Sequence, residues 1–176
     1  MLVIKPFTDT YLEDAAGLFV SNYSLLRTQY PVLPQKYEDR AVIIPFIKNL
    51  ADETEGVVAF SGGALVGYML GMRLPYFKGT SYGAYCPEWA HSAVGDMKTK
   101  IYHQMYRKIS HHWVANGCFT HSFTFLAHER EAIDNFFQIG FGLFVMDALR
   151  SLAPIDQDLP ASIRIRPAEP GDAAGA

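Results

Sequence analysis

Side chains that could accept or donate a proton gather between Glu88 and His121. Glu88 and His91 lie three residues apart in the segment "PEWAH". Carboxylates and imidazoles are among the groups that most often act as acid or base in proteins. Further candidates follow in the next predicted helix and strand: Tyr102, His103, Tyr106 and His121. The simpler interpretation of the tyrosines and of His121 is packing in the core or at its rim, so Glu88 and His91 come first as candidates for proton transfer.

The histidines and cysteines do not show the spacing of a metal site. His111 and His112 are adjacent, so they point to different faces of a helix, and no H-x-x-x-H or C-x-x-C spacing occurs. Cys86 and Cys118 lie in apolar or aromatic surroundings, where free cysteine acts as a small buried apolar residue. We therefore predict neither a metal site nor a disulfide framework.

The composition restricts the class of protein. The chain has 176 residues, of which 49% are apolar and 14% aromatic, which suits one domain with a short appendage. A net charge of -3 and a pI near 6.0 give no positive field for nucleic acid or an anionic membrane. The N-terminal segment lacks the pattern of a signal peptide, and no apolar run reaches the roughly 20 residues of a membrane span. We expect a cytoplasmic protein.

Hydrophobic periodicity and turn residues predict the elements that position these side chains. They are a strand at 2–7, helices at 11–26 and 36–53, a hairpin with strands at 56–60 and 64–74, a strand near 82–94, a helix at 96–117, a strand at 118–127, a helix at 128–140 and a strand at 142–150. Gly62 and Gly63 supply the hairpin turn. Pro45 predicts either a kink or a helix that starts near Ile44. This order predicts an α+β domain with a mixed, mostly antiparallel central sheet flanked by helices on both faces.

Two short motifs within this order carry a resemblance to a known family. They are Ala132 with Gly140 and Phe141, around the last predicted helix, and Gly63, Leu65, Val66 and Gly67 in the hairpin. Together with the order of elements over roughly residues 2–150, they resemble the GNAT superfamily of N-acetyltransferases. The resemblance implies a GNAT-like acyl-CoA N-acyltransferase fold, acetyl-CoA as co-substrate and an amine as acceptor.

The resemblance also implies a place for the pyrophosphate of acetyl-CoA, at the start of the helix that follows "AHSAV". In the family, a glycine-rich turn presents backbone N–H groups there. The residues at the matching positions are Val94, Gly95, Met97, Lys98, Thr99 and Lys100. This turn holds one glycine, and Asp96 stands where the phosphates would lie unless it is simply the N-cap of the helix. The two lysines would compensate for part of its charge.

Catalysis in the family needs a base for the amine proton and a donor for the leaving thiolate. The resemblance places Glu88 and His91 near the strand that faces the acetyl group, and either one is a candidate base. The family's usual donor, a tyrosine of the last helix, corresponds here to Phe136, which has no proton to donate. Two hypotheses follow: an active N-acetyltransferase, or a degenerate non-catalytic module that supports the substrate site of a catalytic second half.

The end of the chain repeats its beginning. Residues 163–167 parallel residues 2–6, and residues 172–175 match residues 14–17. We interpret 1–150 as a GNAT-like domain, 151–162 as a linker and 163–176 as the truncated start of a second GNAT-like domain in cis. The aromatic segment 74–89 would wall a substrate pocket or meet that second domain. Association into a homo-oligomer stays open.

Overall fold

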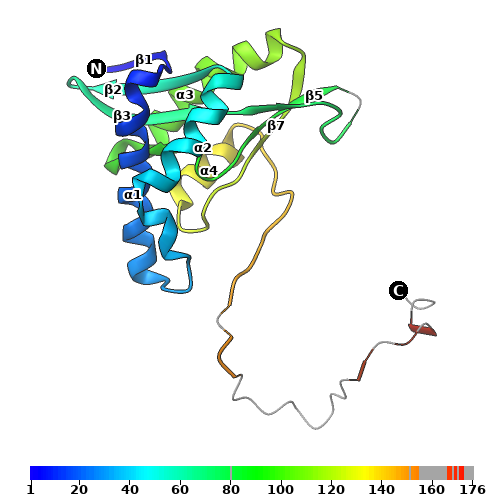
Figure 1. Ribbon diagram of the computed structural model, residues 1–176. Helices are drawn as coiled ribbons and strands as arrows, with labels where there is room; N and C mark the ends of the chain where they lie inside the picture. Colours follow the sequence, from blue (N-terminus) through cyan, green and yellow to red (C-terminus); the bar gives the residue numbers. More distant parts are fainter. Residues whose placement is uncertain (80, 151, 155–165, 168, 170, 173–176) are drawn as a thin grey trace.

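Two small β-sheets form the centre of the molecule, with a pair of helices on each face (Figure 1). The computed structural model describes residues 1–79, 81–150, 152–154, 166–167, 169 and 171–172. One face carries α1 (Leu12–Gln29) and α2 (Arg40–Glu53). The other carries α3 (Lys98–Ala115) and α4 (Arg130–Gln138). The predicted α+β class, with helices on both faces of the sheet layer, is confirmed.

The strands divide between an antiparallel and a mixed sheet. The first sheet has the order β1-β2-β3-β6, from β1 (Leu2–Pro6), β2 (Gly56–Ser61), β3 (Ala64–Leu70) and β6 (His91–Ala93). The second has the order β4-β5-β7, from β4 (Met72–Leu74), β5 (Tyr82–Cys86) and β7 (Cys118–Phe123). Of all these pairs only β5 and β7 are parallel. Short 3-10 turns occupy Asp9–Tyr11, Gln35–Glu38 and Gly95–Met97.

The chain crosses from one sheet to the other at Gly71, inside the stretch predicted as one strand over 64–74. A Cβ atom at this position would lie 2.6 Å from Cζ2 of Trp113 and 3.0 Å from the Cys86 Sγ atom. Such distances are well below van der Waals contact, so only glycine fits between the sheet and α3 here.

Alternate residues of the central strands point into two separate apolar cores. Val57 and Met69 face α3, whereas Val58 and Tyr68 face α1 and α2. This is the two-residue period of a strand that is covered on both faces. Cys86 and Cys118 are free and buried, as predicted. The predicted hairpin turn is also confirmed, with φ of 59° at Gly62 and 86° at Gly63.

Two helix starts differ from the prediction. Helix α2 begins at Arg40 and runs through Pro45, because Asp39 caps it by accepting a hydrogen bond from Ala41 N at 2.8 Å. In the second turn of a helix, proline removes only one backbone bond. Helix α3 begins at Lys98, so Asp96 lies within the preceding 3-10 turn and is not its N-cap.

The strand predicted over 142–150 is wrong. These residues follow α4 without any strand or helix, and their large apolar side chains are exposed. A run of apolar residues makes a strand only where a neighbouring strand can take up the backbone N–H and C=O groups. In the described part of the chain, residues 142–150 pair with no strand.

The predicted linker and second domain lie mostly outside the described residues. In the last stretch, Arg166 pairs with Asp172 at 2.6 Å, and both side chains are partly exposed. No helix in the described ranges is long and apolar enough to cross a membrane.

Candidate active site at the split between the sheets

A split opens where the parallel strands β5 and β7 part. Their ladder ends at Cys86 and Phe123, and one more bond joins Thr124 N to Cys86 O at 2.9 Å. Beyond this point the chain of β5 turns into β6, which pairs with β3 in the other sheet. The outer edge of β6 therefore faces the segment between β7 and α4.

His91 spans this split with both of its ring nitrogens. Its Nε2 atom lies 3.0 Å from Thr124 O and its Nδ1 atom 2.9 Å from the Tyr102 hydroxyl. A carbonyl can only accept, so Nε2 donates to Thr124 and Nδ1 accepts from Tyr102. Burial lowers the pKa of His91 to about 4. The ring is therefore neutral, and neither nitrogen is free to accept another proton.

Glu88 lies beside a small cavity at the same split. The cavity measures about 20 Å³ and is bounded by Phe19, Asn22 and Tyr23 of α1, by Ser92 of β6, and by His128 and Glu129 before α4. In the described part of the chain, Glu88 makes no hydrogen bond or ion pair. Burial, and to a smaller extent the nearby charge of Glu88, raises the pKa of Tyr23. The Glu88 carboxylate is thus an acidic side chain at the cavity that has no polar partner in the described part of the chain.

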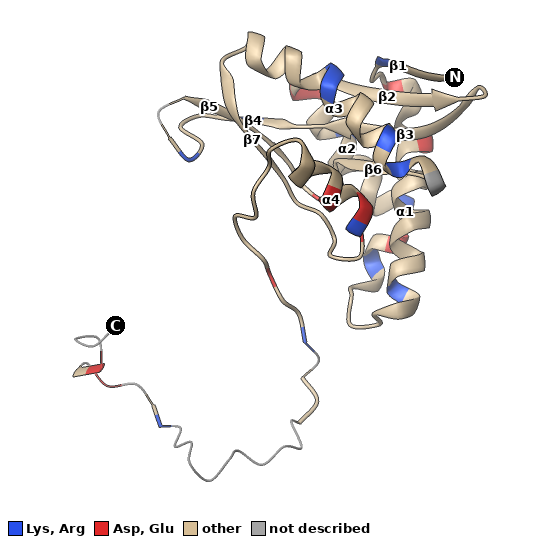
Figure 2. Cartoon of the chain, turned by 180° about the vertical axis from the view of Figure 1, so that it is seen from behind, with Lys and Arg blue, Asp and Glu red and all other residues tan. Residues whose placement is uncertain are grey.

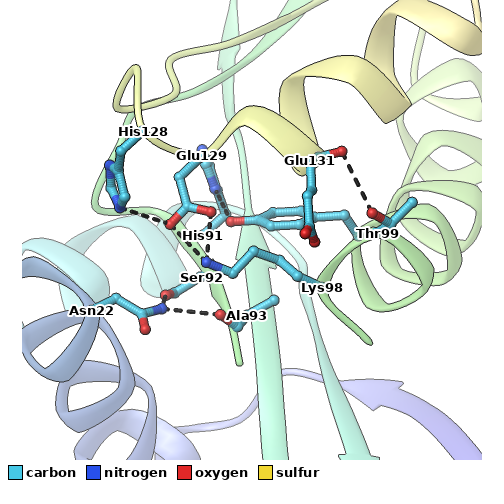
Figure 3. A network of polar contacts seen from close by, with 10 residues as sticks. Asn22, His91, Ser92, Ala93, Lys98, Thr99, His128, Glu129 and Glu131 are labelled. Atoms are coloured by element: carbon cyan, nitrogen blue, oxygen red, sulfur yellow. Dashed lines mark hydrogen bonds and ion pairs between the residues drawn. The ribbon is translucent and has the colours of Figure 1, made fainter. Parts of the chain in front are cut away.

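An ion pair between Lys98 and Glu129 joins the two sides of the split (Figure 3). Lys98 Nζ lies 2.7 and 2.9 Å from the two Glu129 oxygens, and the side chains are only 19% and 11% exposed. His128 Nε2 approaches the same carboxylate at 3.3 Å. Burial alone would raise the pKa of Glu129, but the hydrogen bonds from His128 and Lys98 outweigh it and lower that pKa. This pair ties the first turn of α3 to the start of α4.

Asn22 connects α1 to the outer edge of β6 (Figure 3). Its Nδ2 atom donates to Ser92 Oγ at 2.7 Å and to Ala93 O at 3.0 Å. An amide of this kind satisfies polar groups that the split would otherwise leave without partners.

The residues predicted for the pyrophosphate lie at or near the start of α3, but they do not share one environment. Val94 continues the first sheet, with its N–H donating to Val66 O at 3.0 Å. Gly95 has a φ of 60° and open space above its Cα atom. Lys98 faces Glu129, whereas the side chains at the remaining positions are exposed: Met97, Thr99 and Lys100.

Sequence reasoning missed the residues that close the split. Asn22, Ser92, His128 and Glu129 were not among the predicted site residues. Asn22 could have been found, because it is a polar residue between Phe19 and Tyr23 on the buried stripe of α1. Glu129 gave no such signal, since its partner is 31 positions away.

An aromatic cluster lies at Phe136, the position where the resemblance predicts a tyrosine proton donor. Phe136 is 3% exposed and packs against Phe123, Phe125 and Phe141 at centroid distances of 4.5, 5.0 and 4.9 Å. The neighbouring Tyr106 donates to His121 Nδ1 at 2.9 Å, because His121 Nε2 donates to Cys118 O at 3.0 Å. Burial raises the pKa of the Tyr106 hydroxyl to about 12.

Solved structures are similar to this chain along most of its length. A ribosomal-protein-alanine N-acetyltransferase from Brucella melitensis has a TM-score of 0.64 at 12% identity, with 86% of this chain and 99% of that chain covered. An acetyltransferase from Pyrococcus furiosus, named as putative, has 0.63 at 16%, with 86% and 100% covered. The aminoglycoside N-acetyltransferase AAC(6')-Iy in complex with CoA has 0.56 at 13%, with 87% and 96% covered. No family model and no curated protein matches the sequence. The chain thus has the fold of the GNAT-type acetyltransferases.

Proposed function

We propose that the chain is an N-acetyltransferase that takes acetyl-CoA into the split between β6 and the β7–α4 segment and transfers the acetyl group to an amine. The observation that carries the proposal is the split itself, because it brings a strand edge, the start of α3 and an unengaged carboxylate together. The similar structures support the class of acceptor. One is named as acting on ribosomal-protein alanine and others on aminoglycosides, and these are amines.

Glu88 is the residue we assign to the amine proton. In the reaction, the amine nitrogen bonds to the acetyl carbonyl carbon, the carbon–sulfur bond breaks, and the nitrogen loses a proton. His91 is less suited to take that proton, because both of its nitrogens are engaged. The cavity beside Glu88, about 20 Å³, has room for one water molecule, which would pass the proton on. Phe136 cannot protonate the leaving thiolate, so solvent would do so.

The start of α3 offers part of a phosphate site. A Cβ atom at Gly95 would meet nothing within 4 Å, and the 18-residue helix that follows has no side-chain cap at its N-cap residue, Met97. Lys100 would add a positive charge, and Lys98 would do so if it exchanged Glu129 for a phosphate. The cavity is too small for the pantetheine arm of acetyl-CoA, so binding of acetyl-CoA requires the two sides of the split to move apart.

The test is calorimetric titration of acetyl-CoA into the full chain, followed by thiol release with an aminoglycoside and an alanine-terminated peptide. We expect micromolar binding, about -8 kcal/mol, and release that depends on the amine. Glu88→Gln should lower kcat by roughly 100-fold and leave the acetyl-CoA affinity unchanged. Glu13→Gln, at an exposed glutamate of α1, is the matched control. No heat at millimolar acetyl-CoA would overturn the proposal.

A second candidate is the non-catalytic module, and the closed split favours it. Glu129 already neutralises Lys98, and Phe136 replaces the proton donor. In this case we propose that residues 163–176 begin a second GNAT-like unit that carries the chemistry. Glu129→Gln separates the candidates. If the ion pair merely competes with phosphate, the variant binds acetyl-CoA more tightly than the wild type, whereas a module without a site binds none in either form.

A further inference from the structure

Strand β7 has one edge without a neighbour in the described part of the chain. It is the last strand of its sheet, and β5 pairs with its other edge from Cys118 to Phe123. Phe119, near the start of β7, is 69% exposed. An unpaired edge presents a row of N–H and C=O groups that can receive another strand.

The segment from Leu143 to Leu149 has the composition of a strand. Five of its seven side chains are large and apolar, with exposed fractions of 65% to 75%: Leu143, Phe144, Val145, Met146 and Leu149. Soluble monomers rarely leave such a continuous apolar stretch in water. Both faces of the segment are apolar, so it suits a position where a strand is covered on both sides.

Phe141 packs on the folded body of residues 1–141, and it fixes the place where the segment Leu143–Leu149 leaves that body. Its ring packs against Phe123 at 5.7 Å, Tyr106 at 5.3 Å and Phe136 at 4.9 Å, so the chain departs beside the end of β7. Figures 1 and 2 both show the chain running away from the body after α4. It does not turn back along its own β7 edge, although it starts beside it.

We propose that the segment Leu143–Leu149 of one copy adds as a strand to the free β7 edge of a second copy, and that the two copies exchange these strands about a twofold axis. Each copy carries both the edge and the strand. A twofold arrangement therefore pairs both β7 edges with both apolar segments at once, so that no β7 edge is left for further copies. A partner of another kind would have to bring both an edge and a strand of its own.

Sedimentation equilibrium of the full chain tests the proposal, with Val145→Pro and Met146→Pro as a matched pair. Adjacent N–H groups of a strand point to opposite sides, so one of these two prolines must remove a bond to β7. We expect a dimer whose dissociation constant rises at least tenfold in one variant and less in the other. Both residues lie in a segment without secondary structure, so the monomer should keep its circular dichroism spectrum.

A second pair of variants distinguishes strand exchange from nonspecific hydrophobic association. Leu149 and Leu25 are equally exposed, at 68% and 67%, but Leu25 lies on α1. Leu149→Lys should weaken the dimer, and Leu25→Lys should not. Hydrogen exchange should show that amides of β7 and of residues 143–149 gain protection as the protein concentration rises. A monomeric chain, a dimer insensitive to both prolines, or protection independent of concentration would overturn the proposal.

Discussion

At the scale of single residues, the environment of His91 decides what it can do. An imidazole enclosed by Tyr102, Phe123 and Phe125 has little access to water, so its charged form is costly. The hydrogen bond to Thr124 O favours the proton on Nε2, but burial outweighs it. His91 thus serves to hold the two sides of the split together, which is why we propose Glu88 and not His91 for proton transfer.

The pKa of His91 makes the stability of the fold depend on pH. Between pH 6.5 and about 4, the unfolded chain binds a proton at this residue that the folded chain does not. The stability from neutral His91 is therefore complete above pH 6.5 and is lost as the pH falls toward 4, by about 3 kcal/mol in total. Urea unfolding at several pH values should show this slope.

His91→Gln should flatten the slope between pH 6.5 and 5, whatever its effect on stability at neutral pH. His103→Gln, at an exposed histidine of α3, should keep the slope of the wild type. An equal slope in all three proteins would mean that His91 titrates in the folded state as it does in the unfolded chain.

Only part of the site could be predicted from the residues themselves. Glu88 and His91 stand close together in one short segment, so their types and spacing are visible in the sequence. The contacts from Asn22 to Ser92 and from Lys98 to Glu129 bridge 70 and 31 positions. Such pairs depend on how the helices pack, which no local pattern in the chain encodes.

At the scale of elements, Gly71 is the point on which the two-sheet arrangement depends. We predict that Gly71→Ala destabilises the protein by about 1–3 kcal/mol, because the new methyl group would overlap Trp113 and Cys86. Gly79→Ala is the matched control, since a Cβ atom there meets nothing within 4 Å. Thermal denaturation measures both. Equal stability of the two variants would mean that α3 can shift away from the sheet without cost.

Helices and strands could be predicted where the residues that form an element, and the element it pairs with, lie close together in the sequence. The hairpin of β2 and β3 follows from two apolar runs around Gly62 and Gly63, and α3 follows from apolar residues at four-residue spacing. The prediction of a strand over 142–150 was wrong for the opposite reason. Its run of large apolar residues is typical of a buried strand, but a strand also needs an edge to pair with, and the sequence does not say which edge that is.

At the scale of the whole molecule, the sheet layer separates two cores that belong to different helix pairs. The ion pair of Lys98 with Glu129 and the hydrogen bond of His91 to Thr124 are the polar links across the split between the sheets. A ligand that enters the split must exchange with these links, so opening and binding are coupled. The same links hold the two sides of the split together in this structure.

Removal of residues 142–176 tests whether residues 1–141 fold with the same stability when the rest of the chain is absent. The chain ending at Phe141 keeps both cores and the packing of the Phe141 ring, and it loses only residues that are exposed or outside the described ranges. At concentrations where the full chain is monomeric, we expect the two melting temperatures to agree within about 2 °C. The truncated chain should also stay monomeric at high concentration. A loss of more than about 5 °C would mean that Leu143–Leu149 packs on its own body, and the segment would then be part of the fold and no longer available to a second copy.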